Sequence, residues 1–210
     1  MATRYETGYI KYLTDDEFKK IEKFVNKLQS PSMRMCLKVL MYLGLRSSEA
    51  IALKRQNFNK NFSKLVYTML KSRKVKERHI PAFLRHELAA YHRQWHHRCI
   101  DGFLFFSSYR NQSKSSHIKR SSIGLKFRDM RRRLGLLQSY YTTKNGITLH
   151  RISPHTLRHY ALYKYYKAAG NDVIAARDII GHVKVETTAK YIRSVEVINN
   201  EKLIIEKAFA

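Results

Sequence analysis

A tyrosine, two histidines and two arginines give this sequence the side chains needed to cut a phosphodiester without a metal ion. They are Tyr191, His155, His182, Arg46 and Arg158. The nucleophile in such a reaction must be held in line, and fixed donors must meet the charge that develops on the phosphate oxygens. Arginine suits this task because its planar guanidinium binds two oxygens and stays charged. A tyrosine, whose ordinary pKa is about 10, needs nearby cations or a base to attack at neutral pH.

The spacing of these residues places them at helix ends. The segment GLRSSE puts Arg46 just beyond the end of a predicted helix. The segment HTLRH puts His155 and Arg158 three residues apart, on one face of a helix's first turn, where free backbone amides also favour an anion. The segment GHVKVETTAKY puts His182 nine residues before Tyr191.

These three segments resemble the boxes of the tyrosine recombinase (phage integrase) family, in the family's order, between Leu13 and Arg193. The resemblance implies a tyrosine recombinase catalytic domain, mainly α with a small antiparallel β-sheet (α+β). It also implies roles. Arg46 and Arg158 would clamp the scissile phosphate, and His155 and His182 would hydrogen-bond the phosphate or the nucleophile, one of them taking the tyrosine proton. Tyr191 would attack, leaving a 3′-phosphotyrosyl bond and a 5′-hydroxyl. Rejoining would need no ATP, metal or other cofactor.

The family also has a lysine in a β-hairpin turn that protonates the leaving 5′-oxygen. The usual position here holds Arg73, which does not give up a proton readily. The turn is therefore predicted to be longer than usual, with Lys71 as the general acid and Lys74 as the alternative.

The charge of the chain favours a polyanionic partner. Its 41 Lys and Arg outnumber its 16 Asp and Glu, giving a formal net charge of +25. Duplex DNA explains this excess better than an anionic membrane, because no long basic amphipathic helix is evident. The basic residues expected to touch DNA are Arg73, Lys74, Lys76, Lys119 and Arg120.

The remaining composition predicts an intracellular protein, in the cytoplasm or nucleoid of a host cell. No apolar leader is present in the first twelve residues, and the longest apolar run, Val39–Leu45, is too short to span a membrane. The two cysteines, Cys36 and Cys99, follow no disulfide or metal-binding pattern.

Helix signals dominate the first third of the chain. Thr14 and Glu17 form a capping box, and apolar residues then recur at helical spacing. A second helix is predicted over Met33–Leu43, ending at Gly44, and Ser47 can cap a third.

The middle of the chain is mixed. Residues 62–82 predict two antiparallel strands joined by a cationic turn, and residues 84–98 a helix. Residues 107–122 are interpreted as a loop that opens into a basic helix, and residues 140–150 as a polar loop.

The last third is predicted to be helical. One helix starts at Ser153-Pro154 and runs to Ala169, a second covers Asp172–Ile180, and a third contains Tyr191.

We expect residues 1–210 to form a single catalytic domain, with 1–12 as an arm or linker remnant and without the family's N-terminal DNA-clamping domain. Residues 195–210 form an apolar tail that docks on a neighbouring subunit or folds back on its own domain. The resemblance implies a homotetramer on DNA, with a monomer when free. Two other functions stay open: a type IB topoisomerase-like relaxing enzyme and an inactive DNA-binding remnant.

Overall fold

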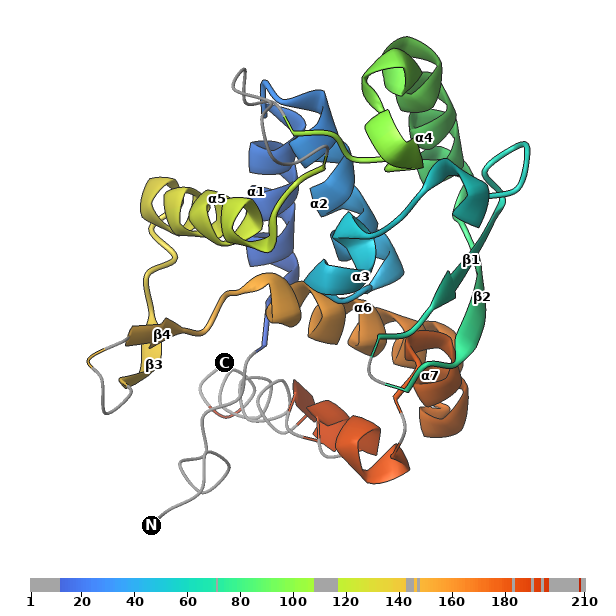
Figure 1. The fold of residues 1–210 in the computed structure, drawn as a ribbon. Coiled ribbons are helices and arrows are strands. Elements are labelled where there is room, and N and C mark those ends of the chain that lie inside the picture. The colour runs from blue at the N-terminus through green and yellow to red at the C-terminus, as the bar shows by residue number, and fades with distance from the viewer. Residues whose placement is uncertain are drawn as a thin grey trace.

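A computed structural model of the chain describes residues 12–70, 72–107, 117–142, 146, 148–182, 184–189, 191–193, 195–196 and 208. Its named helices and strands (Figure 1) are α1 (Asp15–Asn26), α2 (Pro31–Leu43), α3 (Ser47–Ile51), β1 (Lys64–Thr68), β2 (Val75–His79), α4 (Ala82–Trp95), α5 (Arg120–Arg133), β3 (Ser139–Thr142), β4 (Thr148–His150), α6 (Pro154–Ala168) and α7 (Val173–Ile180). Short 3-10 turns lie at Arg55–Asn57, His96–Arg98 and Ile100–Gly102. The predicted mainly helical α+β class is confirmed.

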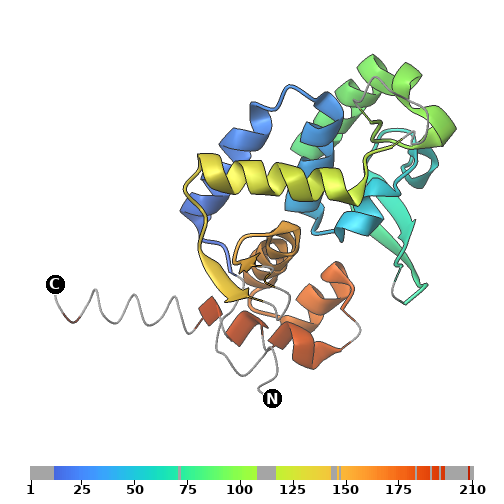
Figure 2. The ribbon, with the colours of Figure 1, turned by 60° about the vertical axis from the view of Figure 1, so that its left-hand side comes forward.

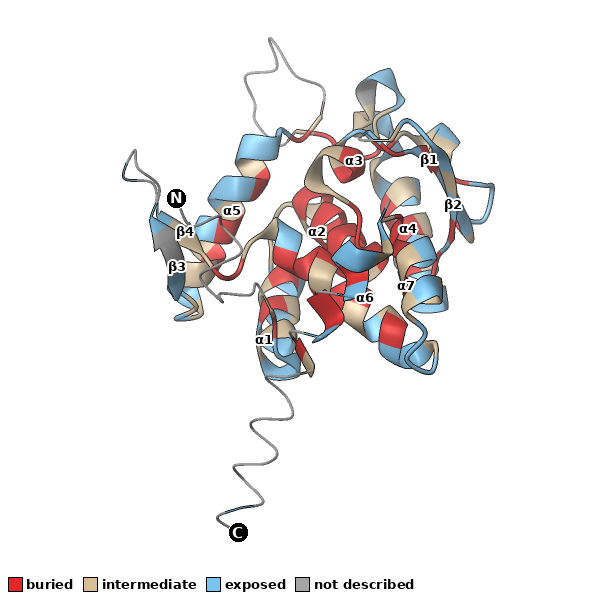
Figure 3. Ribbon diagram, turned by 90° about the horizontal axis from the view of Figure 1, so that it is seen from below, coloured by how far each residue is buried: buried red, intermediate tan, exposed pale blue. Residues whose placement is uncertain are grey.

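Helix α2 lies at the centre of the domain, because apolar side chains cover most of its circumference and so every side must be packed. It packs against α1, α3, α4 and α6. Figure 3 shows buried residues gathered on α2 and α6, and exposed ones on α7, β2 and the outer side of α5. Burial raises the pKa of the Cys36 thiol to about 12, so this cysteine acts as a small apolar residue.

Two predicted helix ends, at Thr14 and at Gly44, are present, whereas the N-cap of α3 is Arg46 rather than the predicted Ser47. The side chain of Thr14 accepts a hydrogen bond from the backbone N–H of Glu17, and the Glu17 carboxylate accepts one from the N–H of Thr14. Helix α2 ends at Gly44, which has φ +60°. A Cβ at Gly44 would lie 2.5 Å from Ile180 Cδ1, so glycine is needed there for both the backbone angle and the close approach of α7.

The part of the chain that the structure describes forms two hairpins, where one was predicted. Strands β1 and β2 pair antiparallel from Lys64↔His79 to Thr68↔Val75, in agreement with the sequence analysis. The segment predicted as a polar loop over 140–150 instead contains part of β3 and all of β4, which pair antiparallel. Threonine and tyrosine, which favour strands, account for this difference. The two hairpins lie on opposite sides of the domain (Figure 2).

Several helix boundaries also differ from the predictions, and α2 begins at Pro31 rather than Met33. Helix α4 begins at Ala82 and ends at Trp95, because the residues up to Arg98 tighten into a 3-10 turn. Helix α5 begins at Arg120, with Lys119 as its N-cap, so part of the expected loop is helical. Residues 108–116 of that loop lie outside the described residues.

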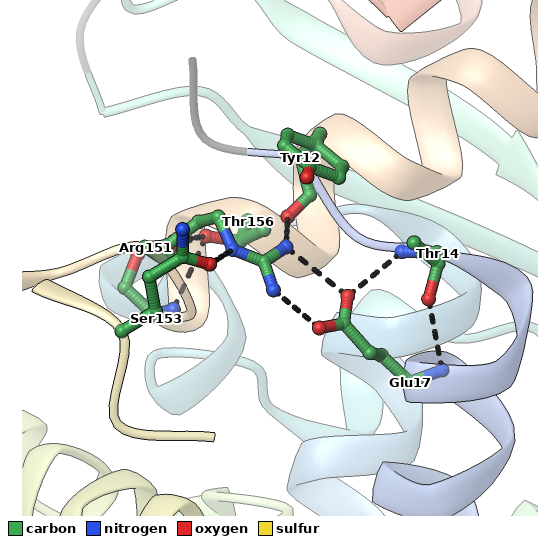
Figure 4. Close-up of polar contacts among 7 residues, drawn as sticks. Tyr12, Thr14, Glu17, Arg151, Ser153 and Thr156 are labelled. Carbon is green, nitrogen blue, oxygen red and sulfur yellow. Dashed lines mark hydrogen bonds and ion pairs between the residues drawn. The ribbon is translucent and has the colours of Figure 1, made fainter. Parts of the chain in front are cut away.

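A buried arginine ties the N-terminus of α1 to the segment before α6 (Figure 4). Arg151 donates to the backbone carbonyl of Tyr12 at 2.8 Å and forms an ion pair with the capping carboxylate of Glu17. Its own carbonyl accepts from Thr156 Oγ1 at 2.7 Å, in the first turn of α6. The helix that carries His155 is thereby fixed against the start of the domain.

A second apolar cluster forms beneath the central core. It joins residues of α6 and α7 to the chain that follows α7: Ala161, Leu162, Tyr166, Ala176, Ile180, Tyr191, Ile192 and Val195. Val195, the first residue of the predicted tail, is thus buried on its own domain, whereas 197–207 and 209–210 lie outside the described residues. None of the described helices has both the length and the apolar character to cross a membrane.

Candidate functional site

The C-terminal end of α2 provides the base of the site. The left-handed Gly44 turns the chain so that Arg46 becomes the N-cap of the short helix α3. Glu49, one turn into α3, accepts a hydrogen bond from the backbone N–H of Arg46 at 2.9 Å. The other oxygen of the same carboxylate lies 2.8 Å from Arg46 Nη1. Arg46 is half-buried, so its guanidinium is held by Glu49 at the surface of the domain.

Arg158 lies deeper, with only 1% of its surface exposed. Its Nη1 donates to the carbonyl of Gly44 and its Nη2 to the carbonyl of Ile180, both at 2.7 Å. These carbonyls end α2 and α7, where the negative ends of two helix dipoles favour a cation. Glu49 Oε2 lies 4.0 Å from Arg158 Nη1, so one buried carboxylate stands between both predicted clamp arginines.

Burial and the neighbouring Arg46 lower the pKa of Arg158 to about 10, partly offset by Glu49. The guanidinium therefore remains charged at neutral pH. A buried cation is tolerated only when it is paired and hydrogen-bonded, which Glu49 and the two carbonyls provide.

His182 follows Gly181, the left-handed C-cap of α7. Its Nδ1 lies 2.9 Å from the buried Thr188 Oγ1. Burial, followed by the charges of Arg158, Arg46 and His155, lowers the pKa of His182 to about 3. The imidazole is therefore neutral at pH 7, and the structure brings these three residues within electrostatic reach of it.

Tyr191 is 8% exposed and lies in the second apolar cluster. Its ring centroid is 4.3 Å from that of His159, which is 4.3 Å from that of the exposed His155. Burial, with a smaller contribution from Tyr163, raises the pKa of the Tyr191 phenol. The nucleophile candidate is thus neutral and packed against a histidine in this conformation.

The candidate lysines lie on the β1–β2 turn. Lys71 is outside the described residues, and Lys74 is exposed, its carbonyl accepting a hydrogen bond from the N–H of Met69 at 2.9 Å. Arg73 is exposed with φ +53°, and Lys76 is half-buried, with its Nζ 3.3 Å from the carbonyl of Asp178.

The two other predicted DNA contacts, Lys119 and Arg120, are exposed where α5 begins. Among the described residues, no group of three or more His, Cys, Asp or Glu side chains is arranged to hold a metal ion.

Four further residues of this region were not predicted from the sequence: Glu49, Arg78, His159 and Thr188. Glu49 had a detectable signal, because it follows Arg46 by three residues at the start of a helix. His159 belongs to the same HTLRH segment as His155. The buried position of Arg78 on a strand of mixed charge had no clear signal.

The fold is similar to those of several solved recombinases. The XerA recombinase matches with a TM-score of 0.65 and 22% identity, over 91% of this chain and 64% of that one. The XerH site-specific recombinase, solved with its palindromic difH substrate after cleavage, matches with a TM-score of 0.64 and 19% identity, over 86% of this chain and 48% of that one. The catalytic domain of bacteriophage HP1 integrase matches with a TM-score of 0.57 and 17% identity, over 89% of each chain.

The chain spans about half the length of XerH and about two thirds of XerA. No curated protein matches the chain in sequence. The model of the phage integrase family matches residues 11–196. Since this match covers most of the 210 residues, the chain belongs to the phage integrase family, the family of the tyrosine recombinases.

Proposed function

We propose that this chain is the catalytic part of a site-specific DNA recombinase or integrase, which cleaves and rejoins duplex DNA through a 3′-phosphotyrosyl intermediate. The observation that carries the proposal is the pair of guanidiniums joined by Glu49, with the neutral His182 beside them. Two fixed cations and a neutral imidazole suit a scissile phosphate, whose charge develops on its non-bridging oxygens.

In the proposed reaction Arg46 and Arg158 bind the phosphate oxygens. Arg158 needs no reorganisation, because its Nη1 and Nη2 are already anchored to two carbonyls. With Nδ1 of His182 facing Thr188, Nε2 is the nitrogen that would meet a phosphate oxygen or the phenol. His155 lies at the start of α6 and is the second imidazole within reach.

The covalent step exchanges one phosphodiester for another. Tyr191 Oη bonds to phosphorus as the bond to the 5′-oxygen breaks, and the phenolic proton passes to His182 or His155. Lys71 or Lys74 protonates the leaving 5′-oxygen. In rejoining, a 5′-hydroxyl attacks the phosphotyrosine and releases Tyr191. The bond energy is retained in the intermediate, so the cycle needs no ATP, and no metal or other cofactor is assigned to it.

The buried position of Tyr191 implies a rearrangement before attack. The phenol must leave His159 and approach the arginines, whose charge would then favour the phenolate. DNA is the partner expected to bring this about, because binding it places a phosphate between the arginines. The basic turn residues Arg73, Lys74 and Lys76, together with Lys119 and Arg120, would contact the backbone of the duplex.

The experiment uses a pool of nicked suicide duplexes with a randomised centre, because the target sequence is unknown. A nick close to the scissile bond lets the cleaved fragment diffuse away and traps the covalent adduct. Denaturing electrophoresis should show a protein–DNA band with the wild type and none with Tyr191→Phe. Sequencing the trapped DNA identifies the site. A DNA-binding protein without any adduct would mean that the chain is an inactive remnant.

A second assay separates recombination from topoisomerase activity. We expect the recovered site to support strand exchange between two duplexes, with a homotetramer assembled on DNA and a monomer when free. Relaxation of a single supercoiled circle by a monomer, without any exchange, would instead favour a type IB topoisomerase-like enzyme. The expected setting is intracellular, where such DNA is found.

A further inference from the structure

The inner face of strand β2 carries two cations rather than apolar side chains. Along β2, Val75, Glu77 and His79 are exposed, whereas Lys76 is half-buried and Arg78 is only 5% exposed. An inward-facing pair of cations is unusual, because a buried charge costs free energy unless a partner compensates it.

Each of the two cations donates a hydrogen bond to the C-terminal turn of a helix. Arg78 Nη1 donates to the carbonyl of Leu43, the last residue of α2, and Lys76 Nζ donates to the carbonyl of Asp178 in the last turn of α7. These are the negative ends of two helix dipoles. The hairpin is therefore attached to the helices by charge as well as by packing.

The same two helix ends hold the phosphate clamp. Arg158 binds the carbonyl of Gly44, adjacent to the Leu43 carbonyl that Arg78 binds, and also that of Ile180. Arg78 is close enough to contribute to lowering the pKa of Arg158. Two arginines, one from the hairpin and one from α6, thus share the end of α2 just before Arg46.

Beside its turn, the hairpin also contacts Gly181, the residue that precedes His182. A Cβ on Gly181 would lie 2.6 Å from Met69 Sδ, so Met69 packs directly on the residue before His182. Met69 is also the residue that closes the turn, since its N–H donates to the carbonyl of Lys74 and its carbonyl accepts from the N–H of Arg73. Between Arg78 and the turn, strand β2 is paired with β1 in a continuous antiparallel ladder.

We propose that Arg78 is a positioning residue: by binding the end of α2, it sets the β1–β2 turn, and with it the lysine that protonates the leaving 5′-oxygen, at the correct place beside the arginine clamp. This inference rests on the proposed strand-transfer function. It assigns Arg78 no contact with DNA or with the reacting atoms. The lysine is Lys74 or Lys71, the latter outside the described residues.

The chemistry of the leaving group provides a specific test. An expelled 5′-alkoxide is a strong base and needs a proton as the bond to phosphorus breaks, whereas an expelled 5′-thiolate is a weak base and leaves without one. A duplex with a bridging 5′-phosphorothiolate at the scissile position therefore makes the general acid unnecessary. The negative charge on the non-bridging oxygens is still present in this duplex, so stabilisation by Arg46 and Arg158 is needed as before.

The experiment measures single-turnover formation of the covalent adduct by Arg78→Met on both duplexes. Methionine is chosen because replacing a buried charge by an apolar side chain of similar volume is often tolerated. We expect cleavage of the ordinary duplex to slow by about 10²-fold, the usual cost of displacing a catalytic group by about 1 Å. Cleavage of the phosphorothiolate duplex should stay within a few-fold of the wild type.

Arg131→Met is the matched control, because Arg131 also donates to a backbone carbonyl, that of Ile152 at 3.0 Å, but lies on α5 away from the hairpin. Whatever slowing it causes should be equal on the two duplexes. If a thermal melt shows that Arg78→Met does not fold, Arg78→Lys takes its place, since lysine keeps the charge but lacks the planar guanidinium. The quantity compared is again the slowing on the ordinary duplex divided by the slowing on the phosphorothiolate duplex.

Equal slowing of Arg78→Met on both duplexes, or no slowing on either, would overturn the inference. If the wild type itself forms no adduct, the proposed function fails, and the two failures are thereby distinguishable. Double variants that combine Arg78→Met with Lys74→Ala or with Lys71→Ala identify the lysine. For the lysine that Arg78 positions, the loss of cleavage rate in the double variant should differ from the sum of the two single losses, expressed as free energies. For the other lysine the two losses should add.

Discussion

The arginine side and the tyrosine side of the site are built differently. Arg46 and Arg158 are fixed by ion pairs to Glu49 and by helix-end carbonyls, contacts that depend on direction. Tyr191 is held instead by apolar and aromatic packing against His159 and its neighbours. Packing is non-directional, and a ring can leave it more readily than an arginine can leave several hydrogen bonds. In the proposed function, this difference corresponds to a pre-assembled phosphate clamp and a nucleophile that is delivered to it.

The strongest test of the comparison removes the deepest member of the clamp. Arg158→Met should lower the rate of covalent adduct formation by about 10²–10³-fold, the usual loss when one oxyanion donor is removed. Arg158→Lys should recover little, because an ammonium cannot hold both the Gly44 and Ile180 carbonyls in the same plane. Single-turnover kinetics on the suicide duplex provide the measurement. A rate within threefold of the wild type in Arg158→Met would show that the clamp is misassigned.

The next test removes the carboxylate that joins the two arginines. Glu49→Ala should reduce the free energy of unfolding by on the order of 3 kcal/mol, because it leaves the buried Arg158 without its carboxylate partner. Chemical denaturation gives this value. The matched control is Glu77→Ala, which breaks the exposed pair with Lys64 and should leave the unfolding midpoint unchanged within error. Similar losses in both variants would contradict the structural role given to Glu49.

A smaller effect is expected on the tyrosine side. His159→Ala removes the ring that packs on Tyr191, so amide hydrogen exchange at residues 191–193 should accelerate by about tenfold, as expected for a loss of about 1.4 kcal/mol in local stability. Exchange in α2 should not change. If amide hydrogen exchange became faster in α2 as well as at residues 191–193, the tyrosine side would not open independently of the central core.

A separate test uses the pH dependence that His182 contributes to stability. Its pKa is about 3 in the folded chain and about 6.5 when unfolded, so between these values the unfolded state binds more protons. The stabilisation is complete above pH 6.5 and is lost as the pH falls toward 3. His182→Gln should therefore lose less unfolding free energy than the wild type between pH 6.5 and 4. Identical pH profiles would show that His182 is not held neutral.

Much of the local structure was readable from the sequence. The capping box at Thr14 and Glu17, the stop at Gly44 and the start of α6 at Ser153-Pro154 each depend on residues within one helical turn, and each is present. The prediction of a polar loop over 140–150 was wrong, because the two strands there are short and have no alternating apolar pattern, which leaves only the strand propensity of threonine and tyrosine as a local signal. The assignment of Lys71 stays a prediction, since it lies outside the described residues.

The sequence alone determined which chemical groups the chain carries and in what order: two arginines, two histidines and a tyrosine, on a strongly cationic chain. Only the tertiary structure decided that Glu49 serves both arginines, that Arg78 turns inward to the end of α2, and that Tyr191 rests on His159. The physical reason is distance along the chain. Arg158 binds a carbonyl 114 residues before it, and no local pattern of side chains specifies a contact that forms only when separate helix ends pack together.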